Sequence, residues 1–255
     1  MPHTLLRDVG RASIVYGSDS PFVNPLVTNM FGPPDPKYQT KPPRSAAEIP
    51  PGIIISPDTR RTERVPAGQS RTRKWPVLHY SNVPHVATAK WTFTLNGLVD
   101  QPRHWSWEEF RALPRVQVYA DFHCVTRWSR LDNVWEGVSL RYLLKEVGVQ
   151  PTAQFALPIA FDGGWTTNLP LSDLLQDDVL LADTHDGELL DPDHGGPVRL
   201  VVPRLYAWKS AKWIRGIELS AEDRPGLWEQ GGYHDRGDPW TVSEDYPDGE
   251  RFRLG

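Results

Sequence analysis

The chain has 255 residues, a net charge of -4, a hydrophobic fraction of 39% and a charged fraction of 24%. These values are close to globular averages, so we expect a sizeable buried core in one large domain or two modest ones. The net negative charge argues against nucleic acid as the main partner, because binding of a phosphate backbone requires a strongly basic surface. No apolar stretch approaches the roughly 20 residues that span a bilayer, and a single cysteine excludes an internal disulfide. We therefore predict a cytoplasmic protein without a membrane span.

Residues 1–75 differ in composition from the rest of the chain. Prolines are dense there, and residues 60–74 carry six basic side chains against one acidic side chain. Proline-rich segments without hydrophobic periodicity are typical of extended chain, and charge runs usually lie in solvent. We predict an extended N-terminal arm over 1–75, which wraps the domain or stays partly mobile, and a folded domain over 76–255.

The first regular elements are expected after residue 90. Residues 91–95 alternate between apolar and polar types, which predicts a strand that ends in a turn at Asn96 and Gly97. Ser106 and Glu109 form the capping box of a short helix that runs to Leu113. Residues 116–120 predict a second strand, which leads the chain towards Cys124.

A clear amphipathic helix follows. Ser139 is its predicted cap, Gly148 ends it, and one face carries Leu140, Leu143, Leu144 and Val147. Further strands are predicted at 154–160, 198–202 and 214–219, and an irregular but folded tail after Ala221. Strands and short helices alternate without a regular βαβ repeat, which favours an α+β fold with mixed β-sheets.

Cys124 is the first candidate for chemistry. A lone cysteine is usually a small buried hydrophobic residue. A nucleophilic cysteine requires a histidine base, and a zinc site requires further ligands at familiar spacings, which are absent from the sequence. Neighbours in an extended segment point to opposite faces, so His123 is not expected to share a metal with Cys124. A single thiolate on a soft, redox-active metal remains the third possibility.

The surroundings of Cys124 resemble a known family. Residues 121–129, the Trp-x-Gly pattern at 135–137 and the helix at 140–144 resemble the cofactor-cysteine segment of sulfite oxidase-like molybdopterin enzymes. In that family a strand-ending cysteine is followed by a Trp-Ser pair, a Trp-x-Gly turn and an amphipathic helix. The family's cysteine ligates molybdenum, and Cys124 stands at the matching position.

A second segment, about 70 residues further on, is similar to the pterin-binding segment of the same family. It spans 194–203 and 209–213, and the resemblance assigns the pterin and its phosphate to His194, Arg199 and Lys212, with Ser210 and Ala211 in the same motif. Residues 75–80 resemble a strand that touches the cofactor, which adds His79 and Tyr80. Residues 226–240 resemble the end of the family's domain. The resemblance implies a sulfite oxidase-type molybdopterin-binding fold, with molybdenum and molybdopterin as cofactors.

The side chains in this segment suit a phosphate. Arg199 can give bidentate hydrogen bonds, and Lys209 or Lys212 can supply a point positive charge. Backbone N–H groups of Gly195, Gly196 and Ser210 can add donors, since no large side chain would block their approach.

The expected reaction also comes from the resemblance. The family's molybdenum centre exchanges an oxo group with a substrate in a two-electron step, and single electrons then pass to or from a partner. Sulfite oxidases have arginines four and five residues after the cysteine, where this chain has Trp128 and Ser129, and its nearest basic residue is Arg127. Trp165 stands where such enzymes often carry a tyrosine near the substrate. We therefore expect a small S-oxide, N-oxide or sulfur oxyanion as substrate, and a separate electron donor or acceptor.

Two other functions remain open. The chain can be a binding or carrier protein that holds the molybdenum cofactor without turnover. A weaker alternative is a metal-free thiol hydrolase, in which Cys124 works with one of the eight histidines.

Overall fold

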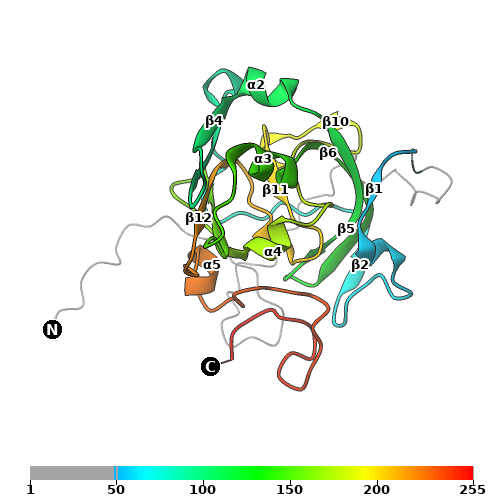
Figure 1. The fold of residues 1–255 in the computed structure, drawn as a ribbon. Helices are drawn as coiled ribbons and strands as arrows, with labels where there is room; N and C mark the ends of the chain where they lie inside the picture. The colour runs from blue at the N-terminus through cyan, green and yellow to red at the C-terminus, as the bar shows by residue number, and fades with distance from the viewer. Residues whose placement is uncertain (1–48, 50, 255) are drawn as a thin grey trace.

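The structure is a computed structural model that describes residue 49 and residues 51–254 (Figure 1). In this part of the chain the strands form two sheets, and each sheet mixes parallel and antiparallel pairs. The larger sheet has seven strands, in the order β1 (Ile54–Ile55), β5 (Val116–Cys124), β6 (Trp128–Ser139), β9 (Leu180–His185) and β10 (Glu188–Leu189), with β2 (Ser70–Thr72) beside β6 and β11 (Arg199–Val201) beside β9. The smaller sheet has five, in the order β4 (Arg103–Ser106), β3 (Thr92–Gly97), β12 (Ile214–Ser220), β7 (Phe155–Ala160) and β8 (Leu169–Pro170).

The helices of the described residues are short. The α-helices are α2 (Trp107–Ala112), α3 (Leu140–Val147), α4 (Leu171–Leu174) and α5 (Leu227–Gln230), and the 3₁₀-helices are η3 (Pro57–Arg60), η4 (Thr88–Lys90), η5 (Pro192–His194) and η6 (Ala207–Lys209). None of the helices among these residues is both long and apolar enough to cross a bilayer. Mixed sheets with few, short helices confirm the predicted α+β class.

The two predicted helix caps are present. At α2, Glu109 N donates to Ser106 Oγ at 3.2 Å, and Ser106 N donates to Glu109 Oε2 at 2.8 Å, which completes the capping box. At α3, Tyr142 N donates to Ser139 Oγ, and Gly148 ends the helix with a φ of 66°. Only glycine adopts that left-handed conformation without strain.

Two sequence-based turns are wrong. Asn96 and Gly97 belong to β3, because parallel pairing with β12 continues to the end of that strand. Trp135 and Gly137 lie inside the 12-residue strand β6, and not in a turn. A Cβ at Gly137 would lie 1.9 Å from the carbonyl oxygen of Leu181 on β9, so glycine permits a close approach of two strands there.

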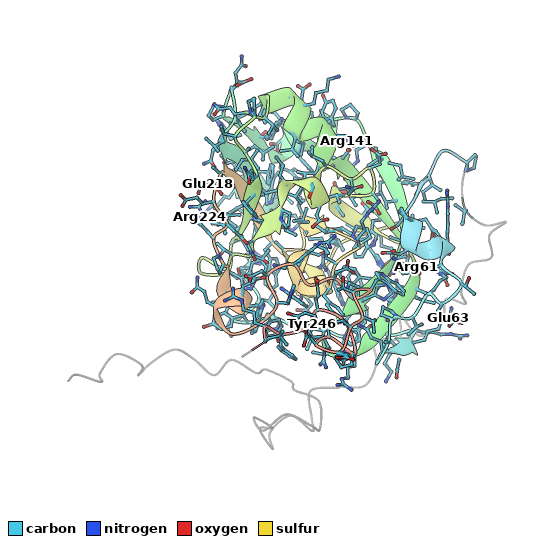
Figure 2. All side chains as sticks on the ribbon, turned by 60° about the horizontal axis from the view of Figure 1, so that its bottom comes forward. Arg61, Glu63, Arg141, Glu218, Arg224 and Tyr246 are labelled. Carbon is cyan, nitrogen blue, oxygen red and sulfur yellow. The ribbon has the colours of Figure 1, made fainter. Side chains whose placement is uncertain are left out.

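Residues 51–75 lie along the larger sheet. β1 pairs with β5, and β2 pairs with β6. Arg64 contacts Asp121 at 2.6 Å and Asp132 at 2.8 Å, and both carboxylates are buried. The expectation of a fully solvated charge run is therefore wrong for Arg64, while the domain boundary at residue 75 stays a prediction. Elsewhere charges of both signs lie close together on the surface, for example Arg224 with Glu218 at 2.8 Å (Figure 2).

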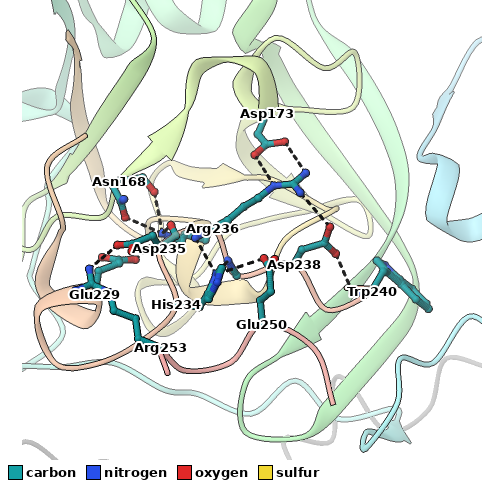
Figure 3. A network of polar contacts seen from close by, with 12 residues as sticks. Asn168, Asp173, Glu229, His234, Asp235, Arg236, Asp238, Trp240, Glu250 and Arg253 are labelled. Atoms are coloured by element: carbon teal, nitrogen blue, oxygen red, sulfur yellow. Dashed lines mark hydrogen bonds and ion pairs between the residues drawn. The ribbon is translucent and has the colours of Figure 1, made fainter. Parts of the chain in front are cut away.

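The chain after α5 is irregular and well connected. It crosses the lower part of the molecule in Figure 1, in orange to red. Arg236 pairs with Asp173 and so connects this segment to the body, and His234 contacts Glu250 within the segment itself (Figure 3). Irregular backbone requires such partners because it lacks a sheet or helix ladder.

The buried side chains form two hydrophobic clusters. One lies under α2 and α3 and includes Phe93, Phe110 and Leu143. The other includes Cys124, Phe122, Trp135 and Tyr206, together with Trp75. Cys124 therefore lies beside an aromatic cluster. Whether its thiol can bind a ligand depends on the groups that surround it.

Candidate cofactor-binding site

Strand β5 ends at Cys124, four residues beyond the strand predicted at 116–120 and in agreement with the family resemblance. A turn of three residues follows, in which Arg127 N donates to Cys124 O at 3.0 Å, and β6 begins at Trp128. Phe122 and Cys124 face the aromatic cluster, whereas the His123 ring faces the other way and contacts Ser129 Oγ at 2.9 Å. This alternation is the ordinary period of a strand.

Segments from both ends of the described chain hold Cys124 and this turn, residues 125–127. Gln69 Nε2 donates to Cys124 O at 3.3 Å, and Ser70 N donates to Arg127 O at 3.0 Å. From the other end, Arg251 donates to Val125 O through Nε at 3.1 Å and Nη2 at 2.9 Å. The position of the cysteine thus depends on residues far from it in sequence.

Cys124 lines a pocket. About 920 Å³ is free of protein atoms there, part of it open to solvent. The pocket is lined mainly by aromatic side chains, with a few charged ones, and the full set is Trp75, Pro76, Leu78, His79, Tyr80, Phe122, Cys124, Val125, Thr126, Trp128, Asp162, Trp165, Arg199, Ala207, Trp208, Ser210, Lys212, Trp213, Trp228 and Tyr233. Residues from both predicted motifs therefore meet at one cavity.

Cys124 is buried, with 6% of the residue exposed. Thr126 Oγ1 donates a hydrogen bond to Sγ at 3.2 Å. Burial raises the pKa of the Cys124 thiol, while the Thr126 hydroxyl and the positive charges of Lys212 and Arg251 act in the opposite direction. Burial is the largest of these effects, so the pKa of the thiol lies above its ordinary value.

Arg199, at the start of β11, is a buried cation on the pocket wall, 2% exposed. It donates from Nη1 to His194 O at 2.8 Å and from Nη2 to Ser210 O at 3.0 Å, with a longer contact from Nε to Leu200 O. No carboxylate of the described residues forms an ion pair with it, and burial lowers the pKa of Arg199 to about 9. A guanidinium has five N–H donors, so at least two remain for a ligand.

The structure separates the two candidate lysines. Lys212 borders the pocket, is half-buried, and donates from Nζ to Asp193 O at 2.6 Å. Lys209 is fully buried and does not line the pocket; its Nζ contacts Glu229 Oε1 at 2.6 Å and Asn168 Oδ1 at 2.8 Å. Lys209 is therefore a structural residue, and only Lys212 can meet a pocket ligand.

Three predicted site residues do not line the pocket. The His194 ring contacts Asp191 Oδ1 through Nδ1 at 2.8 Å and Trp75 O through Nε2 at 3.1 Å. Arg127 is exposed and pairs with Asp248 at 2.9 Å. Ala211 is buried, and its carbonyl accepts from Leu200 N at 2.8 Å. His194 instead supports the pocket wall, because its ring stacks on Trp75 with centroids 3.9 Å apart.

The predicted backbone donors are already occupied. Gly195 N donates to Pro192 O at 3.1 Å, Gly196 N to Asp191 O at 2.9 Å and Ser210 N to Ala207 O at 3.1 Å. Steric crowding explains the glycine at position 196, because a Cβ there would lie 2.3 Å from Leu190 O. The close packing of this loop, and not the approach of a phosphate, explains the glycine there.

Asp162 was not predicted and lines the pocket. It is 8% exposed, and its Oδ1 has no hydrogen-bond partner among the described residues. Burial raises the pKa of Asp162 to about 6, although Lys212 acts to lower it. An acidic residue just before Gly163 and Gly164 in a loop was the available sequence signal. Trp213, Trp228 and Tyr233 were also missed as pocket residues.

Comparison with known proteins identifies the family. The family model of the oxidoreductase molybdopterin-binding domain matches residues 80–228, so the chain belongs to that family. YuiH of Bacillus subtilis, named an uncharacterized oxidoreductase, is 51% identical over 178 residues, which cover 69% of this chain and 89% of that protein. YedZ1 of Azospira oryzae, named a putative protein-methionine-sulfoxide reductase subunit, is 28% identical over 64% of this chain and 63% of its own length.

A solved structure supports the same fold. The sulfane dehydrogenase SoxCD of Paracoccus pantotrophus superposes with a TM-score of 0.53 and 26% identity, over 57% of this chain and 42% of that chain. Family and fold confirm the predicted sulfite oxidase-like molybdopterin fold. The chain is a molybdopterin-dependent oxidoreductase, and the predicted cofactor, molybdopterin with molybdenum, is confirmed for the family.

The residues at the pocket suit this cofactor. Burying a guanidinium costs free energy unless an anion pairs with it. No described carboxylate pairs with Arg199, so Arg199 and Lys212 together can hold a phosphate. The aromatic walls suit a flat pterin, and a thiol suits a soft, redox-active metal.

Proposed function

We propose that this pocket holds molybdopterin, that Cys124 ligates its molybdenum, and that the chain catalyses oxygen-atom transfer on a small S-oxide, N-oxide or sulfur oxyanion. The observation that supports the proposal is that Cys124, Arg199 and Lys212 line one cavity. When bound, the cofactor supplies the two-electron transfer of an oxygen atom. A separate electron donor or acceptor then returns the cofactor to its starting oxidation state.

The chain's own side chains bind and orient the cofactor and the substrate. Arg199 and Lys212 hold the phosphate with charge-assisted hydrogen bonds. Thr126 Oγ1 donates to the sulfur and fixes its direction. Trp165, on the loop after β7, borders the pocket and narrows the substrate space.

The charges near Cys124 bear on the substrate. Arg127, the basic residue nearest to it in sequence, pairs with Asp248 and does not line the pocket. Trp128 lines the pocket instead. This arrangement favours a neutral oxide over sulfite, and the name of the Azospira relative makes a sulfoxide the first compound to try.

Arg199→Gln is expected to lower cofactor occupancy. The glutamine keeps a donor for the backbone carbonyls but removes the charge, so binding weakens by about 1–3 kcal/mol. Molybdenum content per chain, measured by elemental analysis after limited dialysis, checks this result.

Arg204→Gln is the matched control, because Arg204 lies on the same segment, pairs with Asp178 at 3.3 Å and does not line the pocket. It should keep the parental molybdenum content. Equal molybdenum content in Arg199→Gln and Arg204→Gln would show that Arg199 does not bind the cofactor.

Cofactor retention should fall as the pH rises. Burial, followed by the charge of Arg199, lowers the pKa of Lys212 to about 7, so its ammonium is charged below and neutral above that pH. Asp162 is neutral below about 6 and negative above it. The first change removes a positive charge and the second adds a negative one, so the net charge of the pocket falls as the pH rises through about 6 to 7 and anion binding weakens. Molybdenum retained after dialysis at several pH values across that range measures the effect.

Lys212→Arg is the control for this pH dependence, since arginine stays charged throughout the range. The variant should keep more molybdenum than the parent at the alkaline end. An identical decline in both proteins would rule out Lys212 as the titrating group.

Turnover separates the enzyme from a carrier. The molybdenum-loaded chain is mixed with an artificial electron donor and an S-oxide or N-oxide. For the reverse direction it is mixed with sulfite and an artificial electron acceptor. Substrate-dependent change in the molybdenum signal with product formation supports the enzyme. A loaded protein that turns over none of these compounds favours the carrier alternative.

A further inference from the structure

The C-terminal segment reaches back to the cysteine turn through one side chain, Arg251. Its Nε and Nη2 both donate to Val125 O, at 3.1 Å and 2.9 Å, across 126 positions of sequence. Val125 is the residue directly after Cys124, so this fork fixes the peptide that follows the sulfur. The family model ends at residue 228, well before Arg251.

Arg251 is itself held in place. Its Nη1 pairs with Asp248 Oδ2 at 2.9 Å, and the same carboxylate oxygen pairs with Arg127 of the cysteine turn, also at 2.9 Å. Tyr206 Oη donates to Asp248 O at 2.8 Å. The Arg251 side chain is 13% exposed, so its fork is shielded from competing water.

The backbone next to Arg251 is also connected. Arg251 N donates to Gly249 O at 2.8 Å, and His234 N donates to Arg251 O at 3.2 Å. An isolated bridge pairs Phe252 with Tyr233, which lines the pocket. The guanidinium is therefore presented by a fixed segment.

The charge of Arg251 also acts on the sulfur. Its guanidinium donates to the carbonyl oxygen of Val125, the residue bonded directly to Cys124, so a fixed positive charge is held next to the metal-ligand position. A cation at this place stabilises negative charge on the sulfur and on anything bonded to it, because the low-dielectric surroundings screen it weakly.

We propose that Arg251 is a positioning residue of the metal site, which fixes the turn after Cys124 and raises the reduction potential of the molybdenum bound there. The inference rests on the proposed ligation by Cys124. Reduction adds negative charge to the centre, so a nearby cation favours the reduced state. Two effects follow from one side chain: the hydrogen-bond fork orders the turn, and the charge sets the potential.

Charge and geometry can be tested separately in the full, molybdenum-loaded chain. Arg251→Gln removes the charge, and Arg251→Lys keeps the charge but loses the planar fork. Arg253→Gln is the matched control, because Arg253 lies on the same segment and pairs with the exposed Asp235 instead of the turn.

A redox titration followed by the paramagnetic resonance of Mo(V) measures the potential. We expect Arg251→Gln to shift the ratio of oxidised to reduced molybdenum at a fixed potential by about threefold or more towards the oxidised form, where tenfold corresponds to 59 mV for one electron. Arg251→Lys and Arg253→Gln should stay near the parent. A parental potential in Arg251→Gln, or an equal shift in Arg253→Gln, would overturn the proposal.

Hydrogen exchange of the Arg127 amide, which donates to Cys124 O, measures the order of the turn. It should be about tenfold faster in Arg251→Lys, because a charge-assisted fork is lost. This measurement decides the case if Arg251→Gln does not load with molybdenum, and an unchanged exchange rate would then overturn the proposal.

The Cys124→Ala variant separates the two proposals. If its Mo(V) spectrum equals that of the parent, ligation by Cys124 has failed and the role of Arg251 fails with it. If its spectrum changes while Arg251→Gln stays parental, only the role of Arg251 is wrong.

Discussion

Cys124→Ala is expected to abolish oxygen-atom transfer while the fold survives. Loss of a side chain that merely supports a metal ligand costs about 10–100-fold in affinity or activity, so loss of the ligand itself should exceed that range. The free energy of unfolding should change by less than about 2 kcal/mol, since the removed sulfur borders an existing pocket and leaves no new closed cavity. Turnover with an artificial donor and urea denaturation measure the two effects.

Thr126→Val provides the comparison for this variant. It removes the hydroxyl that donates to the Cys124 sulfur and keeps a side chain of similar shape. We expect a loss within the range of a supporting residue, smaller than that of Cys124→Ala. Full turnover in Cys124→Ala would contradict the proposed ligation.

The largest expected effect on stability is at Lys209, which the sequence offered as a phosphate-binding residue. Lys209→Met leaves the Glu229 carboxylate buried without its cation, and both side chains have no exposed area. Breaking a buried pair by removing one partner costs about 3–5 kcal/mol. Urea denaturation of the parent and of Lys209→Met measures the loss in free energy of unfolding.

The double variant Lys209→Met/Glu229→Gln is the control for that loss. It removes the uncompensated charge, while Thr167 and Trp208 can still donate to the remaining amide oxygen. We expect it to recover part of the lost stability. A small change in stability together with a large loss of cofactor in Lys209→Met would return Lys209 to the binding site.

The elements best predicted from sequence are those with local signals. The capping box of α2 and the cap and glycine stop of α3 each depend on residues close in the chain, and both are present. Strands β6 and β9 were not predicted. Nearly all of their residues are buried on both faces, so the alternation that marks a half-buried strand is missing.

The site residues likewise divide into those with a local sequence signal and those placed by tertiary contacts. Its cysteine motif and pterin motif could be found from short segments. Which lysine faces the pocket could not, because Lys209 and Lys212 carry the same charge three positions apart, and tertiary contacts decide between them. The stacking of His194 on Trp75 and the fork of Arg251 on Val125 join residues more than 100 positions apart, where sequence spacing carries no signal.

X-ray absorption at the molybdenum edge tests the central claim most directly, in the loaded parent and in loaded Cys124→Ala. If the Cys124 sulfur is bonded to the metal, the variant shows one sulfur neighbour fewer than the parent. The same number of sulfur neighbours in both proteins would contradict that bond.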